Sequence, residues 1–395
     1  MSEFCITGIG IITAIGNNVA ENHHSLRAGK TGIEKVKYLN TVHRDFLTGE
    51  VKASDMELKQ LAGLDANTVI DRTTLLGLIA AKEALVNAGL NDYSNLGFIS
   101  STTVGGMCNT EQHYPLFLNH QTYPDFIKTH ECASSTFAIA QHLKITGYSD
   151  TISTACSSSA NTIMEACNLI NNNLCEVVIA GGTDALSLFT FNGFNTLMIL
   201  DKEWCRPFDN TRAGLNLGEG AAYLVIEKKD SAFKRGAKIL GYIKGFANHN
   251  DAFHQTASSP EGRGAVMAIQ EAIEMAGIQP ADIDYINAHG TGTPNNDLSE
   301  STAIQTVFGE RWPHFSSTKA YTGHTLAACG SIEAVYSVLS LQNDEIYPNL
   351  NFKTPMEEFG RNPTLELTRG TGVNTILSNS FGFGGNCSSL IISSK

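Results

Sequence analysis

Apolar and polar positions follow two alternating patterns along this chain. Short runs rich in β-branched residues, as at 3–8, 96–102 and 176–186, end in glycine turns and predict buried strands. Longer segments such as 70–89 carry apolar residues at helical spacing and predict helices, here with a stop at Gly89. Strands that alternate with helices across short glycine turns indicate a mixed α/β protein.

The second half of the chain repeats this order of strand and helix. We expect strands at 239–247 and 284–293, helices at 263–278 and 330–342, and a terminal pair of strands within 375–394. The repetition favours two similar α/β halves, although the identity between them is too faint to prove a duplication.

Composition narrows the class of protein. Of 395 residues, 42% are hydrophobic and 17% are charged, which is a globular rather than a disordered composition. The net charge of −12 disfavours a nucleic-acid-binding function, because such proteins usually carry a basic excess. The polar and aromatic segment 109–131 predicts a long loop with short helices.

Cysteine usage and the first residues bear on the compartment. Nine cysteines without a C-x-x-C pair favour free thiols in a reducing cytoplasm over a disulfide framework. The N-terminus lacks a basic region, and no apolar run approaches the ~20 residues that cross a bilayer, so we expect neither a signal peptide nor membrane insertion. The sequence lacks dinucleotide, phosphate-loop and metal-ligand motifs, so we expect no cofactor and no metal.

The segment 150–170 places a cysteine between a predicted strand and a predicted helix. Cys156 lies in STACSSS, among small residues that leave room for an acyl group. A helix N-terminus offers free N–H groups and a positive dipole end, which favour the nucleophilic thiolate over the thiol. The alternative is a buried structural cysteine, and both interpretations stay open on this segment alone.

Two histidines lie at similar junctions. His289 is in NAHGTGTP, at a predicted strand end before a glycine turn, and His324 is in KAYTGHTLAACG, before a predicted helix. Side chains at such strand ends face ligands in open α/β sheets. Each histidine alone is explained as well by hydrogen bonds in the core, but together with Cys156 they form a candidate site.

A lysine, a glutamate and a glycine-rich loop complete the candidates. Lys319 has small and apolar neighbours, so we expect it to be buried beside an acidic partner, for which Glu300 is the candidate; a solvated lysine is the alternative. The loop NSFGFGGN at 379–386 combines flexible backbone with phenylalanine rings. Its N–H groups suit an oxyanion and its rings suit a gate, whereas the simpler alternative is a hairpin turn.

Four of these segments together resemble the elongating β-ketoacyl-acyl-carrier-protein synthases of the thiolase superfamily. TACSSS, NAHGTGTP, STKAYTGH and NSFGFGGN occur in the order and at the spacing of that family, over essentially the whole chain. ITGIG, AGGTDA and RPFDNTRAGLNLGEGAA fit as well. The chain departs from the family at GFGGNC, where GFGGTN is usual.

The resemblance implies a thiolase-like fold, with two similar α/β halves in a layered αβαβα arrangement. We place the halves at residues 1–235 and 236–395, the first with the nucleophile and the second with both histidines and the glycine-rich loop. The resemblance also implies a Cys-His-His site, because His324 stands where the priming synthases have asparagine.

The implied reaction is a decarboxylative Claisen condensation. Cys156 would accept an acyl group from a thioester, and a malonyl thioester on acyl carrier protein would then lose carbon dioxide. His289 and His324 would hold the enolate oxygen while the enolate attacks the acyl group and lengthens it by two carbons. The backbone N–H groups of Cys156 and Phe383 would hold the oxyanion.

Supporting roles follow from the same resemblance. Lys319 and Glu300 are similar to the charged pair near the family's histidines. Phe383 matches the gating phenylalanine, with Phe381 and Gly384 in the same loop, and Val104 falls at an acyl-pocket position.

The implied partners are acyl carrier protein and a second subunit, either an identical chain or a chain-length-factor homologue. Residues 67–71 and 195–201 lack the basic residues with which the family often docks its carrier; the first ones are Arg72 and Lys202. Docking elsewhere, or on a partner, is therefore expected. The stretch GTDALSLFTFNGFNTL is similar to synthases of aryl-polyene pathways, which leaves polyene or polyketide synthesis open beside fatty-acid elongation.

Two other functions compete with a condensing enzyme. A non-catalytic chain-length factor would usually lack the cysteine, which is present here. A thioester hydrolase would use the same cysteine and histidines but admit water in place of a malonyl thioester.

Overall fold

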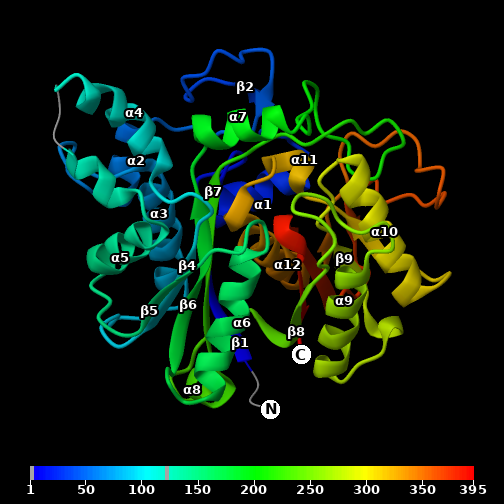
Figure 1. Ribbon diagram of the computed structural model, residues 1–395. Helices are drawn as coiled ribbons and strands as arrows, with labels where there is room; N and C mark the ends of the chain where they lie inside the picture. The colour runs from blue at the N-terminus through cyan, green and yellow to red at the C-terminus, as the bar shows by residue number, and fades with distance from the viewer. Residues whose placement is uncertain (1–3, 121–123) are drawn as a thin grey trace.

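The structure is a computed structural model that describes residues 4–120 and 124–395. Its main feature is a ten-stranded sheet with helices on both sides (Figure 1). The first half of the chain supplies β1 (Phe4–Thr13), β4 (Gly97–Ser101), β5 (Ser149–Ile152), β6 (Val177–Asp184) and β7 (Gly220–Lys228). The second half supplies β8 (Gly241–Asn250), β9 (Tyr285–Asn287), β10 (His314–Ser316), β13 (Thr375–Gly382) and β14 (Asn386–Ser393).

Strand order is the same in the two halves. It is β1-β7-β6-β4-β5 in the first and β8-β14-β13-β9-β10 in the second, so each strand has a counterpart at the same rank along the chain. The directions also match, because the first three strands of each series are antiparallel and the last three are parallel. β1 and β8 pair antiparallel and join the halves. The prediction of two similar α/β halves is confirmed; the residue at which they divide stays a prediction.

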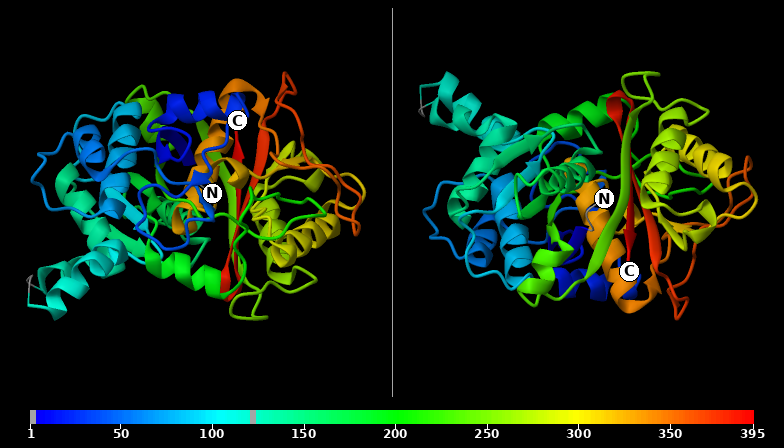
Figure 2. Two further views of the ribbon diagram at one scale, coloured as in Figure 1. Left: turned by 90° about the horizontal axis from the view of Figure 1, so that it is seen from above. Right: turned by 90° about the horizontal axis from the view of Figure 1, so that it is seen from below.

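Helices pack in three layers, one on the outer face of each half of the sheet and one between the two halves (Figures 1 and 2). The first half contains α1 (Val19–Arg27), α2 (Asp55–Ala62), α3 (Arg72–Asn87), α4 (Met107–Leu118), α5 (Cys132–Leu143), α6 (Ser158–Asn171), α7 (Leu188–Thr196) and α8 (Lys229–Lys234). The second contains α9 (Arg263–Ala276), α10 (Pro294–Phe308), α11 (Lys319–Thr322) and α12 (Cys329–Asn343). Short elements are β2 (Glu34–Lys35), β3 (Leu47–Thr48), β11 (Glu345–Ile346), β12 (Thr368–Arg369), η1 (Pro124–Thr129), η2 (Pro280–Asp282), η3 (Leu326–Ala328) and η4 (Phe383–Gly385).

The central helix layer explains the apolar patterns. α6 and α12 pack against each other and against both half-sheets, and every residue of α12 from Cys329 to Leu341 is buried. A helix that is apolar on all sides belongs in such an interior. α3 and α5 cover the outer face of the first half, and α9 and α10 that of the second. The layered αβαβα arrangement is therefore confirmed.

One segment differs from its prediction. Residues 107–118 form the three-turn helix α4, where the sequence predicts a long loop with short helices, despite Pro115 inside it. None of its residues is buried, so the helix had no apolar stripe to reveal it. η1 agrees with the short helices expected in that segment, and residues 121–123 lie outside the described part. Over residues 4–120 and 124–395, none of the helices is both long and apolar enough for a membrane span.

Candidate active site

Cys156 lies in a tight turn between β5 and α6. The preceding Ala155 has a left-handed φ of 52°, which is uncommon for a residue with a side chain. Two serines hold the turn: the Ser157 hydroxyl donates to the Thr154 carbonyl at 2.8 Å, and the Thr154 N–H donates to the Ser158 hydroxyl at 2.8 Å. The small residues of STACSSS thus brace a strained turn.

The glycine-rich loop closes over this turn. A Cβ on Gly382 would lie 3.0 Å from the Cys156 nitrogen and 3.0 Å from the Thr154 oxygen, so only glycine fits there without a shift. The next backbone N–H, of Phe383, donates toward the Cys156 sulfur. The N–H groups of Cys156 and Phe383 are thereby brought to the same thiol.

The protonation state of Cys156 differs from the sequence-based expectation. Burial raises the pKa of its thiol to about 11, against opposing effects of the Lys319 ammonium and the Phe383 N–H. α6 begins two residues after Cys156, and desolvation outweighs any help from its dipole. The resting form is a thiol, and the expected resting thiolate is wrong.

His289 and His324 face each other beside the turn. His289 follows β9, and His324 follows α11 through Gly323. Gly323 has φ 73° and lies so close to Leu217 that a Cβ would come within 2.9 Å of the Leu217 backbone. The two imidazole centroids are 5.4 Å apart with the rings nearly perpendicular, at 86°. Two segments 35 positions apart in the sequence thus bring their rings into contact.

The hydrogen bonds fix the tautomer of both rings. The Leu326 N–H lies 3.1 Å from His324 Nδ1, and the Lys319 ammonium lies 3.2 Å from His289 Nδ1. Both partners can only donate, so each Nδ1 accepts and each proton sits on Nε2. Burial, joined by the charge of Lys319, holds the pKa of both histidines well below the ordinary value. The site therefore contains two neutral imidazoles, each with an Nε2–H donor.

The expected pairing of Lys319 with Glu300 is wrong. Lys319 is buried as predicted, but its ammonium forms an ion pair with Glu333 of α12 and donates to the His289 carbonyl at 2.6 Å. Glu300 instead accepts the backbone N–H groups of His289 at 2.9 Å and of Gly290 at 2.7 Å. Glu300 supports the histidine turn through its backbone rather than through the lysine.

Several groups offer ligand atoms of the kinds that bind metals. A His289 nitrogen, the Cys329 sulfur and a Glu333 oxygen lie within 4.8 Å of one another. The Lys319 ammonium already contacts two of these three residues. A cation there would have to displace a buried positive charge, so this cluster does not suit a metal.

The phenylalanines of the loop have different surroundings. Phe383 is half-buried and stacks on Phe194 of α7, with centroids 5.6 Å apart and planes at 17°. Phe381, expected in the same gating group, is instead buried in the core beside His289, at a centroid distance of 5.8 Å. The Gly384 N–H donates to the Gln255 carbonyl at 2.8 Å and is not directed at an oxyanion.

Val104 lies in the turn between β4 and α4. The neighbouring Thr103 donates its N–H and hydroxyl to the buried carboxylate of Asp184. Asp184 also accepts the Ala327 N–H at 2.8 Å, three residues after His324. Asp184 therefore ties the turn of Val104 to the histidine segment, while lining of an acyl pocket by Val104 stays a prediction.

Sequence reasoning missed three residues of this region: Glu333, Asp184 and Cys329. The signal for Glu333 was a single carboxylate within the otherwise apolar helix at 330–342, which needs a buried cation. Asp184 stands in AGGTDA, a segment that predicts a strand and turn and fits the family, but gives Asp184 no role by itself. Cys329 had no local signal, because nothing near it in the sequence points to Cys156.

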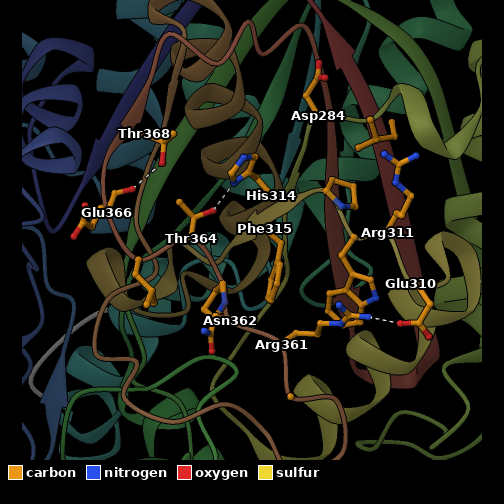
Figure 3. Close-up of a pocket in the computed structure, with 16 residues that line it drawn as sticks. Asp284, Glu310, Arg311, His314, Phe315, Arg361, Asn362, Thr364, Glu366 and Thr368 are labelled. Carbon is orange, nitrogen blue, oxygen red and sulfur yellow. Dashed lines mark hydrogen bonds and ion pairs between the residues drawn. The ribbon is translucent and has the colours of Figure 1, made fainter.

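A separate surface pocket of about 1080 Å³ lies at the opposite edge of the sheet, beside β10 (Figure 3). It is lined by residues 310–315 and by the loop 360–368. Arg361 crosses it to Glu310 at 2.7 Å and lies over the Trp312 ring. None of the candidate residues lines this pocket, so it is no part of the site around Cys156.

The family models and similar relatives agree on one kind of protein. The models "Beta-ketoacyl synthase, N-terminal domain" and "Beta-ketoacyl synthase, C-terminal domain" match residues 1–232 and 240–353. The chain is 35% identical to "3-oxoacyl-[acyl-carrier-protein] synthase 2" of Staphylococcus aureus, over 98% of this chain and 99% of that one. The protein of the same name from Synechocystis is 34% identical, over 96% and 95%.

Solved structures agree in fold. "The ishigamide ketosynthase/chain length factor" superposes with a TM-score of 0.92 at 27% identity, covering 100% of this chain and 99% of that one. A chain of the structure "Ketosynthase (ApeO) in Complex with its Chain Length Factor (ApeC) from Xenorhabdus doucetiae" gives a TM-score of 0.85 at 30% identity, over 100% of this chain and 98% of that one.

Proposed function

Since this chain belongs to the β-ketoacyl synthase family of condensing acyltransferases, we propose specific roles for its residues: Cys156 carries the acyl chain, and His289 and His324 hold the enolate that extends it. The acyl and malonyl groups arrive on acyl carrier protein, as the names of the relatives suggest.

Loading is a thioester exchange. The Cys156 sulfur attacks the acyl carbonyl, the carbon–sulfur bond to the carrier breaks, and the proton of Cys156 leaves with the carrier thiol. The N–H groups of Cys156 and Phe383 hold the oxygen of the tetrahedral intermediate. The contact of the Phe383 N–H with the Cys156 sulfur supports this role.

Condensation depends on the two Nε2–H donors. When the malonyl thioester loses carbon dioxide, the electron pair of the broken carbon–carbon bond forms an enolate. The enolate oxygen accepts both hydrogen bonds. The enolate carbon then attacks the acyl carbonyl on Cys156, and the sulfur of Cys156 leaves as a thiolate, which takes a proton from water to restore the thiol. The observation that carries this proposal is the acceptor role of both Nδ1 atoms, because it fixes both protons on the side of the substrate.

Lys319 acts as a positioning residue in this scheme. Its ammonium keeps His289 neutral and fixes its tautomer, and Glu333 balances the buried charge. The same ammonium opposes the rise in the Cys156 pKa that burial causes. One cation thus serves both halves of the reaction.

We infer a paired assembly with a second chain of the same fold. Two of the solved relatives are named as ketosynthases with chain length factors. α4 projects from the body and exposes Tyr114, Leu116, Phe117 and Leu118 (Figure 2). β5 is an edge strand of the main sheet. An exposed apolar segment and an open sheet edge are each typical of a subunit interface.

Arg72 and Lys202 are poorly suited to dock an acidic carrier protein. Arg72 forms ion pairs with Asp55 and with the buried Glu219, and Lys202 pairs with Asp45. Their charge is already balanced, so an acidic carrier gains little from them. This supports docking at another surface or on the partner chain.

All nine cysteines are free thiols, which supports the reducing cytoplasm as the compartment.

The decisive experiment supplies acylated and malonylated carrier protein to the enzyme and measures carbon dioxide and β-ketoacyl product. We expect both products from the wild type and neither acylation nor product from Cys156→Ala. Release of free acid without carbon dioxide would identify a hydrolase. Unchanged stimulation of a partner ketosynthase by Cys156→Ala would identify a non-catalytic chain-length factor.

A further inference from the structure

A second buried thiol lies beside Cys156. Cys329 is the first residue of α12, is only 2% exposed, and donates its S–H to the Cys156 carbonyl oxygen at 3.0 Å. Its sulfur is also within 4.8 Å of a His289 nitrogen. The condensation reaction described above assigns this thiol no role.

We propose that Cys156 and Cys329 form a reversible disulfide when a peroxide enters the site. The carbonyl carbon and the Cβ of Cys156 are both bonded to its Cα, so a sulfur that hydrogen-bonds to the carbonyl oxygen also lies near the Cys156 side chain. The two thiols are close enough for a charge on one to act on the other, and a rotation about the Cys156 side chain can bring the sulfurs together. Cys132 also contacts this turn, through Ser153, but among the described cysteines only Cys329 has a recorded hydrogen bond to Cys156 itself. The inference rests on the proposed reactivity of Cys156.

The chemistry has two balanced steps. Cys156 gives up its proton, and its thiolate sulfur attacks one peroxide oxygen; the O–O bond breaks, the leaving hydroxide takes the proton as water, and Cys156 becomes a sulfenic acid. The Cys329 sulfur then attacks the sulfenic sulfur, giving the disulfide and a second water. The two thiols together lose two hydrogens, and one peroxide is reduced to two waters.

The consequence is protection of the nucleophile. A sulfenic acid without a neighbouring thiol is open to further oxidation to sulfinic acid, which thiol reductants do not reverse. Capture by Cys329 stops the oxidation at a state that reductants restore. Loss of acyl loading would then be temporary in the wild type.

The test treats the full-length, acyl-free enzyme with hydrogen peroxide, then measures acyl loading of Cys156 before and after dithiothreitol. Cys329→Ser keeps a donor for the Cys156 carbonyl but removes the second sulfur, and Cys329→Ala serves as a second variant. Cys175→Ala, in a half-buried loop outside the site, is the matched control. Peptide mapping of the oxidised wild type identifies the linked cysteines without any variant.

We expect a Cys156–Cys329 peptide and nearly full recovery in the wild type and in Cys175→Ala. In Cys329→Ser the dithiothreitol-resistant loss should be at least ~5-fold greater, with sulfinic acid at Cys156. Equal irreversible loss in wild type and Cys329→Ser, or linkage of Cys156 to a different cysteine, overturns the proposal. Acyl loading before peroxide treatment reports the proposed function by itself, so the two failures are distinguishable.

Discussion

At the scale of single residues, the protonation states in the site depend on burial more than on neighbouring charges. The same desolvation that raises the pKa of the Cys156 thiol lowers the pKa of both imidazoles. All three groups are therefore neutral at rest, with the buried Lys319–Glu333 pair behind them. A neutral site suits a reaction in which the thiol gives up its proton only during attack and both rings must remain N–H donors.

Alkylation of Cys156 should follow its raised pKa. We expect the rate with iodoacetamide to rise steadily from about pH 7 to about pH 10 without a plateau, because only the thiolate reacts. Lys319→Met should slow alkylation further, since it removes a charge that favours the thiolate. The measurement is peptide mass spectrometry at Cys156; a plateau below about pH 8 would contradict a buried neutral thiol.

The histidines should be needed for condensation rather than for loading. His324→Ala removes one Nε2–H donor, and we expect its condensation rate to fall ~10²- to 10³-fold while Cys156 still accepts an acyl group. Because the pKa of both histidines is held well below its ordinary value, wild-type condensation should not lose activity through histidine protonation between about pH 8 and about pH 6. Equal loss of loading and condensation in His324→Ala would show a structural rather than a donor role.

At the scale of elements, the site is a meeting of three turns. The Cys156 turn between β5 and α6, the His289 turn after β9 and the loop η4 each lie at the end of a strand. Glycines allow them to approach one another, and buried carboxylates accept the backbone N–H groups that the turns leave free. Backbone contacts therefore fix the positions of the site residues as much as side-chain contacts do.

Gly382→Ala tests this close approach. An added Cβ would lie 3.0 Å from the Cys156 nitrogen, so we expect acyl loading to fall at least ~10-fold and stability to fall by ~1–3 kcal/mol. Gly193→Ala in α7 is the control, because nothing lies within 4 Å of its added Cβ. The control should be neutral or slightly stabilising, by up to ~1 kcal/mol. Loading kinetics and thermal unfolding measure both effects; equal behaviour of the two variants would refute the steric argument.

At the scale of the whole molecule, two halves of one topology place their strand ends around a shared centre. The first half brings Cys156 and the second brings both histidines, with α6 and α12 packed between the sheets. α12 also starts at Cys329 and carries Glu333, so one buried helix contacts both the nucleophile and the Lys319 ammonium. The outer surface of the first half carries α4, which exposes apolar side chains near its C-terminal end.

Charged substitutions on α4 should disrupt the proposed assembly. Tyr114→Glu with Leu118→Glu places two carboxylates on one exposed face of α4, because the two positions are four residues apart in the helix, and we expect the paired chains to separate without unfolding. Leu174→Glu, exposed at the end of α6, is the control and should leave the assembly unchanged. Light scattering after size exclusion gives the mass in each case. An unchanged mass for the α4 variant would place the interface elsewhere.

The sequence by itself determined the local features of this protein. The strand and helix order, the glycine turns and the four motifs with Cys156, His289 and His324 were all visible in short segments, because backbone conformation and turn chemistry depend on near neighbours. The helix α4 escaped prediction because it buries none of its residues.

Only the tertiary structure decided which distant groups share the interior. It paired Lys319 with Glu333 rather than Glu300, placed Phe381 in the core, put Cys329 on the nucleophile's carbonyl and made Cys156 a neutral thiol. The physical reason is that desolvation and ion pairing depend on which surfaces meet on folding. The residue pattern within one segment does not specify which distant segment it will contact.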